Sequence, residues 1–273
     1  MWLNDIYQHL NPIAFSAGPI TIRWYGLAYL AGFVLGALVI WKVQRRWGLG
    51  LDREDLLSVM IGIAFGVIIG ARLGYVLFYG AGYYLEHPLS VFVLSEGGMS
   101  FHGGLAGAIV GGSIACRRLG ISIPTMCDLG VIAAPVGLFF GRCANFVNGE
   151  LWGKPTDLPW GVMFETGGGV YRHPSQLYEA LLEGLVMFCV LFALSRRRPP
   201  RPQGTFLGMF CVLYGIFRFL IEFVRMPDEQ LGYLIAGTIT MGQILSLPLV
   251  VLGVAILVVS RRRDRPQAGY LEG

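Results

Sequence analysis

Seven long apolar runs constrain the fold of this chain more than any other feature of its sequence. Each approaches the roughly 20 residues that an α-helix needs to cross a bilayer. Because only helices and closed barrels satisfy their backbone groups in hydrocarbon, and these runs lack period-2 alternation, they predict helices. The predicted spans are residues 24–41, 56–79, 99–116, 125–147, 176–194, 204–224 and 237–260.

The composition agrees with an all-α, polytopic membrane protein. Of the 273 residues, 55% are hydrophobic and only 14% are charged, against about 25% charged in an ordinary soluble domain. No polar connection is long enough to build a soluble domain, so residues 1–273 are predicted to form a single membrane domain. The first 20 residues lack the cationic start of a cleaved signal peptide. Apolar residues at helical spacing there predict a short helix in the membrane interface: Trp2, Leu3, Ile6, Tyr7 and Leu10.

Basic residues follow the odd-numbered spans, which predicts the orientation of the chain. The crowded side is expected to be cytoplasmic by the positive-inside rule, with the N-terminus outside and the C-terminus inside. The net charge of +4 comes from these basic clusters. We expect them to set the topology and to contact anionic membrane lipids. Nucleic-acid binding would need a basic face on a folded module, and the sequence shows none. The clusters are Lys42, Arg45, Arg46 and Arg53; Arg117 and Arg118; Arg196, Arg197, Arg198 and Arg201; and Arg261, Arg262, Arg263 and Arg265.

Cysteine and histidine usage gives no metal or cofactor prediction. The five cysteines lie apart within predicted spans and form no CxxC pair, and the four histidines are scattered. This argues against a disulfide framework or a zinc site.

Glycines recur every four residues on two predicted spans, at 62, 66, 70 and 74 and at 103, 107 and 111. Small residues at this spacing let helices approach closely, so the pattern favours helix packing. Admission of lipid between these helices is the alternative.

Three arginines lie inside predicted spans: Arg72, Arg142 and Arg218. Ionisable residues in a membrane are costly and usually functional. At 1.5 Å per residue each lies roughly 21–26 Å from the inner end of its span, in the outer half. Residues expected at a similar level are Tyr25, His102 and Glu150.

The sixth span carries a polar face, because Tyr214, Arg218, Glu222 and Arg225 fall within about 80° of one another at 100° per residue. Taken singly, these residues have plain explanations. Arg218 and Glu222 could neutralise each other as an i,i+4 pair, Arg142 could snorkel to the interface, and His102 could be a satisfied histidine at a helix start. None of these explains why several spans bring polar groups to one outer layer. The joint pattern predicts a site among the helices that opens to the outer leaflet.

Two or three guanidiniums without a metal cluster suit a phosphate ester, because arginine matches phosphate oxygens in a bidentate fork. At this depth, the available phosphate is a phospholipid head group. Cys143 is a weak candidate nucleophile, since it neighbours Arg142 and no histidine flanks it.

The motif GRCANFVNGELWG (141–153) closely resembles the signature of the bacterial prolipoprotein diacylglyceryl transferases. Three further blocks resemble that family in the same order: GGMSFHGG (97–104), RHPSQLYE (172–179) and LYGIFRFLIEFVR (213–225). The likeness extends from RWYGL (23–27) to the last predicted helix. The fixed positions matched in the signature are Gly141, Arg142, Asn145, Phe146, Asn148, Glu150 and Gly153.

The resemblance implies an enzyme of the bacterial inner membrane, with seven spans, an outward N-terminus and a site toward the periplasm. Loops 80–98 and 148–173 would form a small periplasmic head. Such an enzyme moves the diacylglyceryl group of phosphatidylglycerol to the thiol of the lipobox cysteine, next to the signal peptide of a prolipoprotein. Glycerol phosphate leaves and a thioether remains.

The resemblance implies that Arg142 would hold the lipid phosphate. We further expect Arg218 to stabilise the leaving group, because preorganised charge there lowers the barrier. Either His102 is the general base, or the arginine field alone lowers the thiol pKa. The residues expected to orient the head group and hold the arginines are Tyr25, Asn145, Asn148, Glu150, Tyr214, Glu222 and Arg225.

Two other classes of protein were weighed. A transporter of an anionic substrate would usually show internal repeats and broken helices near the midplane, whereas no half-to-half similarity is visible. A purely structural membrane protein leaves the gathering of Arg142, Arg218, Glu150 and His102 unexplained.

Overall fold

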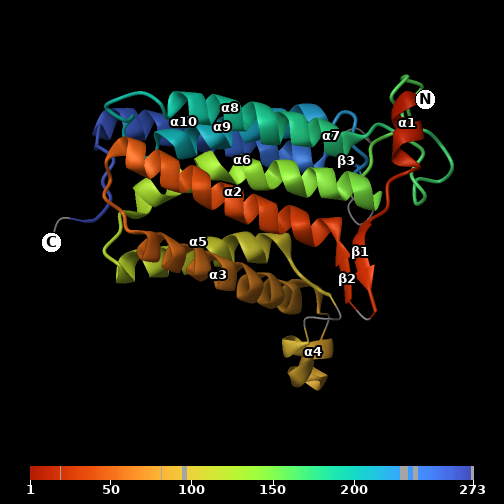
Figure 1. Cartoon of the computed structure of the whole chain (residues 1–273), viewed down its shortest axis with the longest axis horizontal. Coiled ribbons are helices and arrows are strands. Elements are labelled where there is room, and N and C mark those ends of the chain that lie inside the picture. Colours follow the sequence, from red (N-terminus) through yellow and green to blue (C-terminus); the bar gives the residue numbers. More distant parts are fainter. Residues whose placement is uncertain (19, 81, 94–96, 228–232, 236–238, 272–273) are drawn as a thin grey trace. The chain divides into compact units, whose positions relative to one another are not determined.

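The computed structural model describes residues 1–18, 20–80, 82–93, 97–227, 233–235 and 239–271. Its contacts divide the chain into two compact units (Figure 1). Unit 1 comprises Met1–Trp47 and Cys127–Gln267, and unit 2 comprises Gly48–Met126 and Ala268–Gly273. The prediction of a single domain stays a prediction.

A helix occupies each of the seven segments predicted to span a membrane. Five segments are long and apolar enough to cross a bilayer: α2 (Trp24–Trp47), α3 (Arg53–Tyr79), α6 (Ile123–Asn148), Ser175–Leu194 and α10 (Met241–Arg263). The fourth of these consists of α7 (Ser175–Glu179), the π-helix η3 (Ala180–Val186) and α8 (Met187–Leu194). Helix α9 (Thr205–Ile221) is shorter, and α5 (Phe101–Arg118) is rich in glycine. The chain is therefore a mostly helical, multi-pass membrane protein.

Several predicted spans differ from the helices by a few residues; α2, for example, continues to Trp47. Helix α9 ends at Ile221, and residues 222–224 form turns. Helix α10 begins at Met241 because Thr240 and Gln243 form a capping box, in which each side chain satisfies a backbone N–H of the other residue. Residues 237 and 238 of the last predicted span, and residues 81 and 94–96 of the predicted outer loop, lie outside the described residues.

The short segments of unit 1 combine predicted and unpredicted structure. Helix α1 (Trp2–Tyr7) confirms the predicted short helix. Tyr7 packs inward with Phe146 and Phe164, whereas Trp2 and Ile6 are exposed. The antiparallel strands β1 (Ile13–Ala17) and β2 (Ile20–Arg23) were not predicted, nor were β3 (Tyr233–Ile235) and β4 (Ile239–Thr240).

Glycines allow two pairs of helices to pack closely. In unit 1, α9 and α10 meet where a Cβ on Gly253 would lie 2.7 Å from the Gly208 carbonyl oxygen. In unit 2, a Cβ on Gly74 would lie 2.9 Å from the Gly103 Cα, and a Cβ on Gly66 would collide with the Gly107 carbonyl. The packing role predicted for the glycine repeat is therefore confirmed.

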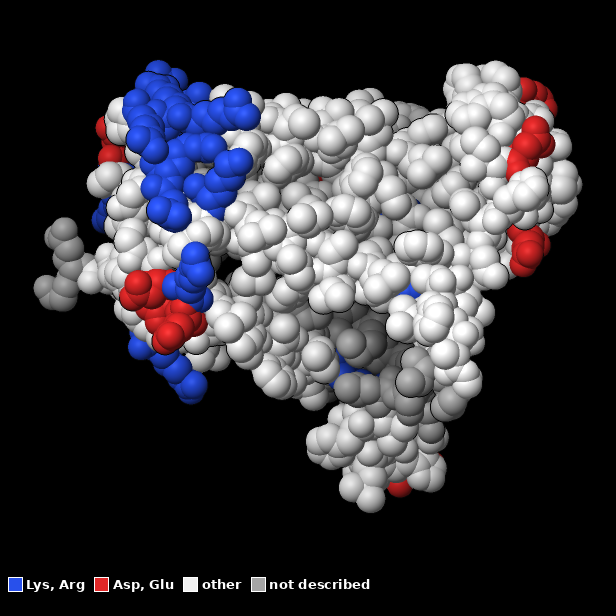
Figure 2. Space-filling view, viewed as in Figure 1, with Lys and Arg blue, Asp and Glu red and all other residues white. Residues whose placement is uncertain are grey.

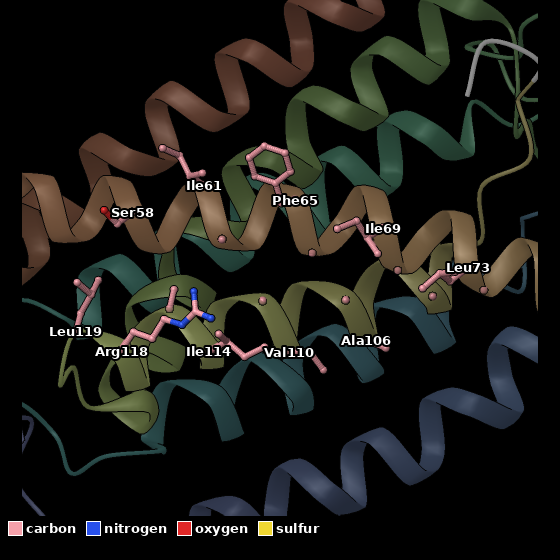
Figure 3. Close-up of a pocket in the computed structure, with 18 residues that line it drawn as sticks. Ser58, Ile61, Phe65, Ile69, Leu73, Ala106, Val110, Ile114, Arg118 and Leu119 are labelled. Carbon is pink, nitrogen blue, oxygen red and sulfur yellow. The ribbon is translucent and has the colours of Figure 1, made fainter. Parts of the chain in front are cut away.

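A groove of about 820 Å³ follows the α3–α5 seam (Figure 3). Its walls are apolar side chains, including Phe65 and Leu73 of α3 and Val110 of α5, and Ser58 and Arg118 line one end. Unit 2 also contains α4 (Tyr83–Glu86) and the 3₁₀-helix η1 (Pro88–Phe92).

Candidate functional site

The centre of the site in unit 1 is a carboxylate that the sequence analysis did not single out. Glu179 ends α7, and its side chain is fully buried. Its Oε2 lies 2.7 Å from Nε of Arg142 on α6. Its Oε1 lies 2.8 Å from Nη1 of Arg218 on α9 and 3.3 Å from Nε of Arg225. One carboxylate thus joins three of the arginines predicted for the site, although they are far apart in the sequence.

Two further buried carboxylates complete the group. Glu183, on η3, is fully buried and lies 3.8 Å from Nη2 of Arg142. Glu222 pairs with Arg218, which confirms the predicted i,i+4 ion pair. Glu222 also accepts a hydrogen bond of 2.6 Å from Thr240 Oγ1. The pair is part of a larger network, so mutual neutralisation of Arg218 and Glu222 is an incomplete explanation. We call Arg142, Arg218, Arg225, Glu179, Glu183 and Glu222 the arginine–glutamate network.

The accessible edge of this network is positive. The side chains of Arg142 and Arg218 are 18% and 16% exposed, whereas those of Glu179 and Glu222 are 0% and 3% exposed. Nη1 of Arg142 takes part in neither of that residue's two ion pairs. Buried carboxylates therefore hold both guanidiniums, while part of each arginine side chain stays accessible to an anion. Such preorganised donors suit a phosphate oxygen.

Close helix packing places the carboxylates beside Arg142. A Cβ on Gly184 of η3 would lie 2.7 Å from the Cβ of Phe139 on α6, so only glycine permits this approach. Glu183 precedes Gly184, and Arg142 lies almost one turn after Phe139. π-Helical turns are rare and are often found at functional sites, and here η3 carries Glu183.

A second polar cluster continues from Arg142 along α6. Asn145 Nδ2 donates a hydrogen bond of 2.7 Å to Glu150 Oε1, and Asn148 Nδ2 reaches the same oxygen at 3.5 Å. Gln176 Nε2, on α7, donates to the Glu150 carbonyl at 2.6 Å. Asn145 lies three residues after Arg142 on α6, and Gln176 lies three residues before Glu179 on α7. Both helices therefore connect this cluster to the arginine–glutamate network.

The loop after α6 is held in shape by glycine. Gly149 has φ of +69°, and Leu151 also has a positive φ of 59°, which costs of order 1 kcal/mol or more for a residue other than glycine. Gly153 pairs with Arg225 in an antiparallel bridge. A Cβ on Gly153 would lie 2.5 Å from the Val224 carbonyl oxygen and 2.7 Å from the His173 Cβ. The final glycine of the signature therefore allows the contact that holds Arg225 at the network.

Two predicted tyrosines lie beside these clusters. Tyr214 on α9 stacks on Phe210 with ring centroids 5.8 Å apart and interacts electrostatically with Arg142 and Arg218. Tyr25, at the start of α2, hydrogen-bonds Tyr29 at 3.1 Å and also interacts with Asn145 and Glu150.

Two other predicted residues belong to unit 2. His102 is exposed in the first turn of α5, where its ring meets that of Phe101 edge-on at 5.5 Å. Arg72 of α3 donates hydrogen bonds of 2.5–3.2 Å to five backbone carbonyl oxygens of η1 and of the described residues that follow it. Arg72 therefore holds residues 90–93 and 97–98 against α3. The loop carbonyls belong to Ser90, Val91, Val93, Gly97 and Gly98.

The segment between α6 and α7 has its own polar network. Arg172 stacks over Trp152 at 3.9 Å and donates to the Gly167 carbonyl at 2.6 Å. Trp160 Nε1 donates to Tyr178 Oη at 2.7 Å, and that hydroxyl lies 3.2 Å from His173 Nδ1. With its oxygen accepting from Trp160, the Tyr178 hydroxyl has its proton available to donate to Nδ1 of a neutral His173 ring. Burial and the Lys154 charge lower the pKa of His173, which agrees with a neutral ring.

The general rule for ionisable residues in a membrane applies equally to Glu179 and Glu183, which lie on the fifth predicted span and were missed. Gln176 is not ionisable, and it was missed as well. In the part of the chain that the structure describes, no group of three or more His, Cys, Asp or Glu residues is placed to hold a metal ion.

Known proteins resemble this chain over nearly its whole length. The family model for prolipoprotein diacylglyceryl transferase matches residues 12–259. A protein from Geobacter sulfurreducens is 51% identical over 95% of this chain and 99% of its own length. Relatives from Nitratidesulfovibrio vulgaris strain DP4 (47%) and Pseudomonas paraeruginosa (44%) cover 92% and 96% of this chain and 95% and 97% of their own lengths. All three are named phosphatidylglycerol–prolipoprotein diacylglyceryl transferase. The chain belongs to the prolipoprotein diacylglyceryl transferase family.

Proposed function

We propose that this transferase moves the diacylglyceryl group of phosphatidylglycerol to the thiol of a prolipoprotein's lipobox cysteine. The observation that carries this proposal is the arginine–glutamate network, in which Glu179 fixes Arg142, Arg218 and Arg225 and leaves a positive edge accessible. The substrates named for the relatives support the same reaction.

The proposed setting is the bacterial inner membrane, crossed seven times, with the N-terminus outside. Five segments are long and apolar enough to span it, and α5 and α9 complete the proposed set. In this arrangement, residues 1–273 act as one membrane domain. The arginine–glutamate network faces the outer leaflet, and loops 80–98 and 148–173 form the periplasmic head.

In the proposed reaction, the thiolate of the substrate cysteine attacks the carbon of the diacylglyceryl group that carries the phosphate ester. A carbon–sulfur bond forms, the carbon–oxygen bond breaks, and its electron pair leaves on glycerol phosphate. The outer edge of Arg142 binds the phosphate, and Arg218 stabilises the negative charge that grows on it. Removal of one such donor typically lowers turnover by about 100- to 1000-fold.

The remaining predicted residues have supporting roles in this proposal. Glu222 pairs with Arg218, and Arg225 pairs with Glu179, so both help to fix the network. Tyr214 limits how the phosphate lies against the arginines. The residues that orient the glycerol head group are Tyr25, Asn145, Asn148 and Glu150.

The thiol proton leaves by one of two routes. His102 accepts it as general base, or the guanidinium field lowers the thiol pKa so that solvent accepts it. Turnover of His102→Gln as a function of pH separates these routes. Near-normal turnover at pH 7 would remove His102 as the base.

Mass spectrometry tests the proposed reaction directly. The purified protein is incubated in detergent with phosphatidylglycerol and a lipobox peptide, and we expect the peptide to gain one diacylglyceryl mass through a thioether. A peptide with serine in place of the cysteine is the matched control and should stay unmodified. An unmodified cysteine peptide, with an intact and folded protein, would contradict the proposal and favour transport of an anionic substrate.

A further inference from the structure

Basic side chains gather where the helices α2 and α8 of unit 1 end (Figure 2). Within this patch, three cations lie over one aromatic ring. Relative to the ring centroid of Phe192 on α8, Lys42 Nζ lies at 5.8 Å, Arg46 Cζ at 5.2 Å and Arg196 Cζ at 5.6 Å. We call Lys42, Arg46 and Arg196 the cation cluster. The ring attracts each cation, although the cations repel one another.

The cation cluster has a fixed base. Arg46 Nη1 donates to Ser195 Oγ at 3.4 Å, and Trp47 Nε1 donates to the Ser195 carbonyl at 2.9 Å. Ser195 is 1% exposed, and its hydroxyl donates to the Phe192 carbonyl at 2.7 Å. Arg46 is therefore held against the end of α8, while Lys42 and Arg196 are exposed.

The buried carboxylate of Asp128 in unit 1 is directed away from the cation cluster. Over the described ranges, none of the ion pairs involves a member of the cation cluster. Asp128 is fully buried and accepts hydrogen bonds of 2.8 Å from the N–H groups of Gly204 and Leu207. An external anion would consequently meet positive charge that this part of the chain does not neutralise.

An apolar surface adjoins the charge. Leu38, one turn before Lys42 on α2, is 57% exposed. On the other helix, Phe188 stacks on Phe192 with centroids 5.2 Å apart, and Leu185 is 47% exposed. A free phosphate would use only the cations, whereas a phospholipid also places an acyl chain along an apolar helix surface.

We propose that the cation cluster binds the head-group phosphate of an anionic phospholipid in the leaflet opposite the transfer site. The lipid phosphate lies among Lys42, Arg46 and Arg196, and one acyl chain lies along Leu38 and Leu185. This lipid is a ligand that stays bound and is not a substrate, because the arginine–glutamate network contains none of these residues.

Native mass spectrometry of the full chain in detergent tests this proposal. Phosphatidylserine and phosphatidylcholine with the same acyl chains are titrated separately. We expect the wild type to bind phosphatidylserine at least tenfold more tightly, with a preference that weakens as salt rises. In K42Q/R46Q/R196Q the preference should fall to about twofold or less. A matched control, R261Q/R262Q/R263Q, removes the same charge from the end of α10 and should keep most of the preference.

A second variant guards against loss of the fold, since Arg46 is half-buried. K42Q/R196Q changes only exposed side chains and should lose part of the preference. The proposal is overturned if the cluster variants keep the wild-type preference, or if the α10 control loses as much as they do. Displacement of phosphatidylserine by an equal concentration of inorganic phosphate would also overturn it, because the site would then bind phosphate alone.

Discussion

Two groups of three cations in unit 1 have different surroundings. Glu179 contacts Arg142, Arg218 and Arg225 within 2.7–3.3 Å, and the carboxylate is fully buried. The cation cluster instead surrounds the ring of Phe192 and includes exposed side chains. Burial explains the difference. A charge removed from water needs a fixed partner of opposite sign, whereas a charge at the surface remains solvated and can bind a mobile partner.

The largest effect is expected when the shared partner of the buried arginines is removed. Glu179→Gln keeps the shape of the side chain but leaves three guanidiniums without their common carboxylate, which should cost about 3–5 kcal/mol of unfolding free energy. Transfer activity should fall by about 100-fold or more, because Arg142 and Arg218 lose their position. Thermal unfolding in detergent and the peptide assay measure the two effects. A variant as stable and active as the wild type would show that Glu179 does not organise the network.

Changing the shape of a buried cation while keeping its charge should affect activity more than stability. Arg142→Lys and Arg218→Lys each replace a planar fork with a point charge, so we expect turnover to fall by about 100-fold. Arg196→Lys in the cation cluster is the matched control and should keep its activity. If all three variants retained activity, charge alone would suffice at the site, and the predicted bidentate contact would be wrong.

The buried group should also depend on the loop that holds Arg225. Gly153→Ala places a methyl group against the Val224 carbonyl and the His173 Cβ, and such overpacking typically costs about 1–3 kcal/mol. Chemical unfolding measures this loss. Gly169→Ala is a useful comparison, because no atom lies within 4 Å of the position that its new methyl group would take, although its φ of +71° adds strain. An unchanged unfolding free energy for Gly153→Ala would exclude close packing at this position.

The stability of the segment between α6 and α7 should respond to pH through His173. The pKa of His173 is lowered in the folded chain. Above the usual pKa of about 6.5, its ring is therefore neutral in both the folded and the unfolded chain. As pH falls through 6.5 toward the lower folded pKa, the unfolded chain binds the proton more readily, and stability is lost. Melting temperature measured from pH 7.5 to 5 should fall more steeply for the wild type than for His173→Gln. Parallel curves would exclude His173 as the source.

The smallest effect on folding is expected at the surface group. K42Q/R46Q/R196Q should change the unfolding free energy by about 0.5 kcal/mol or less, because exposed charges contribute little to stability. Thermal unfolding in a neutral detergent measures this. A loss comparable to that of Glu179→Gln would erase the difference between the two groups.

Local patterns predicted the helices and four of the six residues of the arginine–glutamate network. The apolar runs located every long helix, and the signature 141–153 located Arg142, Asn145 and Glu150. The Arg218–Glu222 pair followed from helical spacing alone. These features are short-range, so they depend on residues only a few positions apart.

Long-range contacts were harder to predict. Glu179 joins residues of α6 and α9 that no local pattern connects. The β1–β2 hairpin was missed because its strands of five and four residues lie beside a stronger helical pattern at the N-terminus. The role of Arg72 depends on a loop that folds back onto α3, so its depth in the span could not distinguish a structural arginine from a functional one.

The central claim is that the arginines fixed by Glu179 bind the phosphate of the lipid that reacts. The most direct measurement is release of glycerol phosphate from phosphatidylglycerol in the presence of a lipobox peptide, compared for the wild type, Arg142→Ala and Arg196→Ala. We predict release that requires the peptide cysteine, that is lost in Arg142→Ala, and that persists in Arg196→Ala. Release that persists undiminished in Arg142→Ala would contradict the claim and place the reacting phosphate elsewhere.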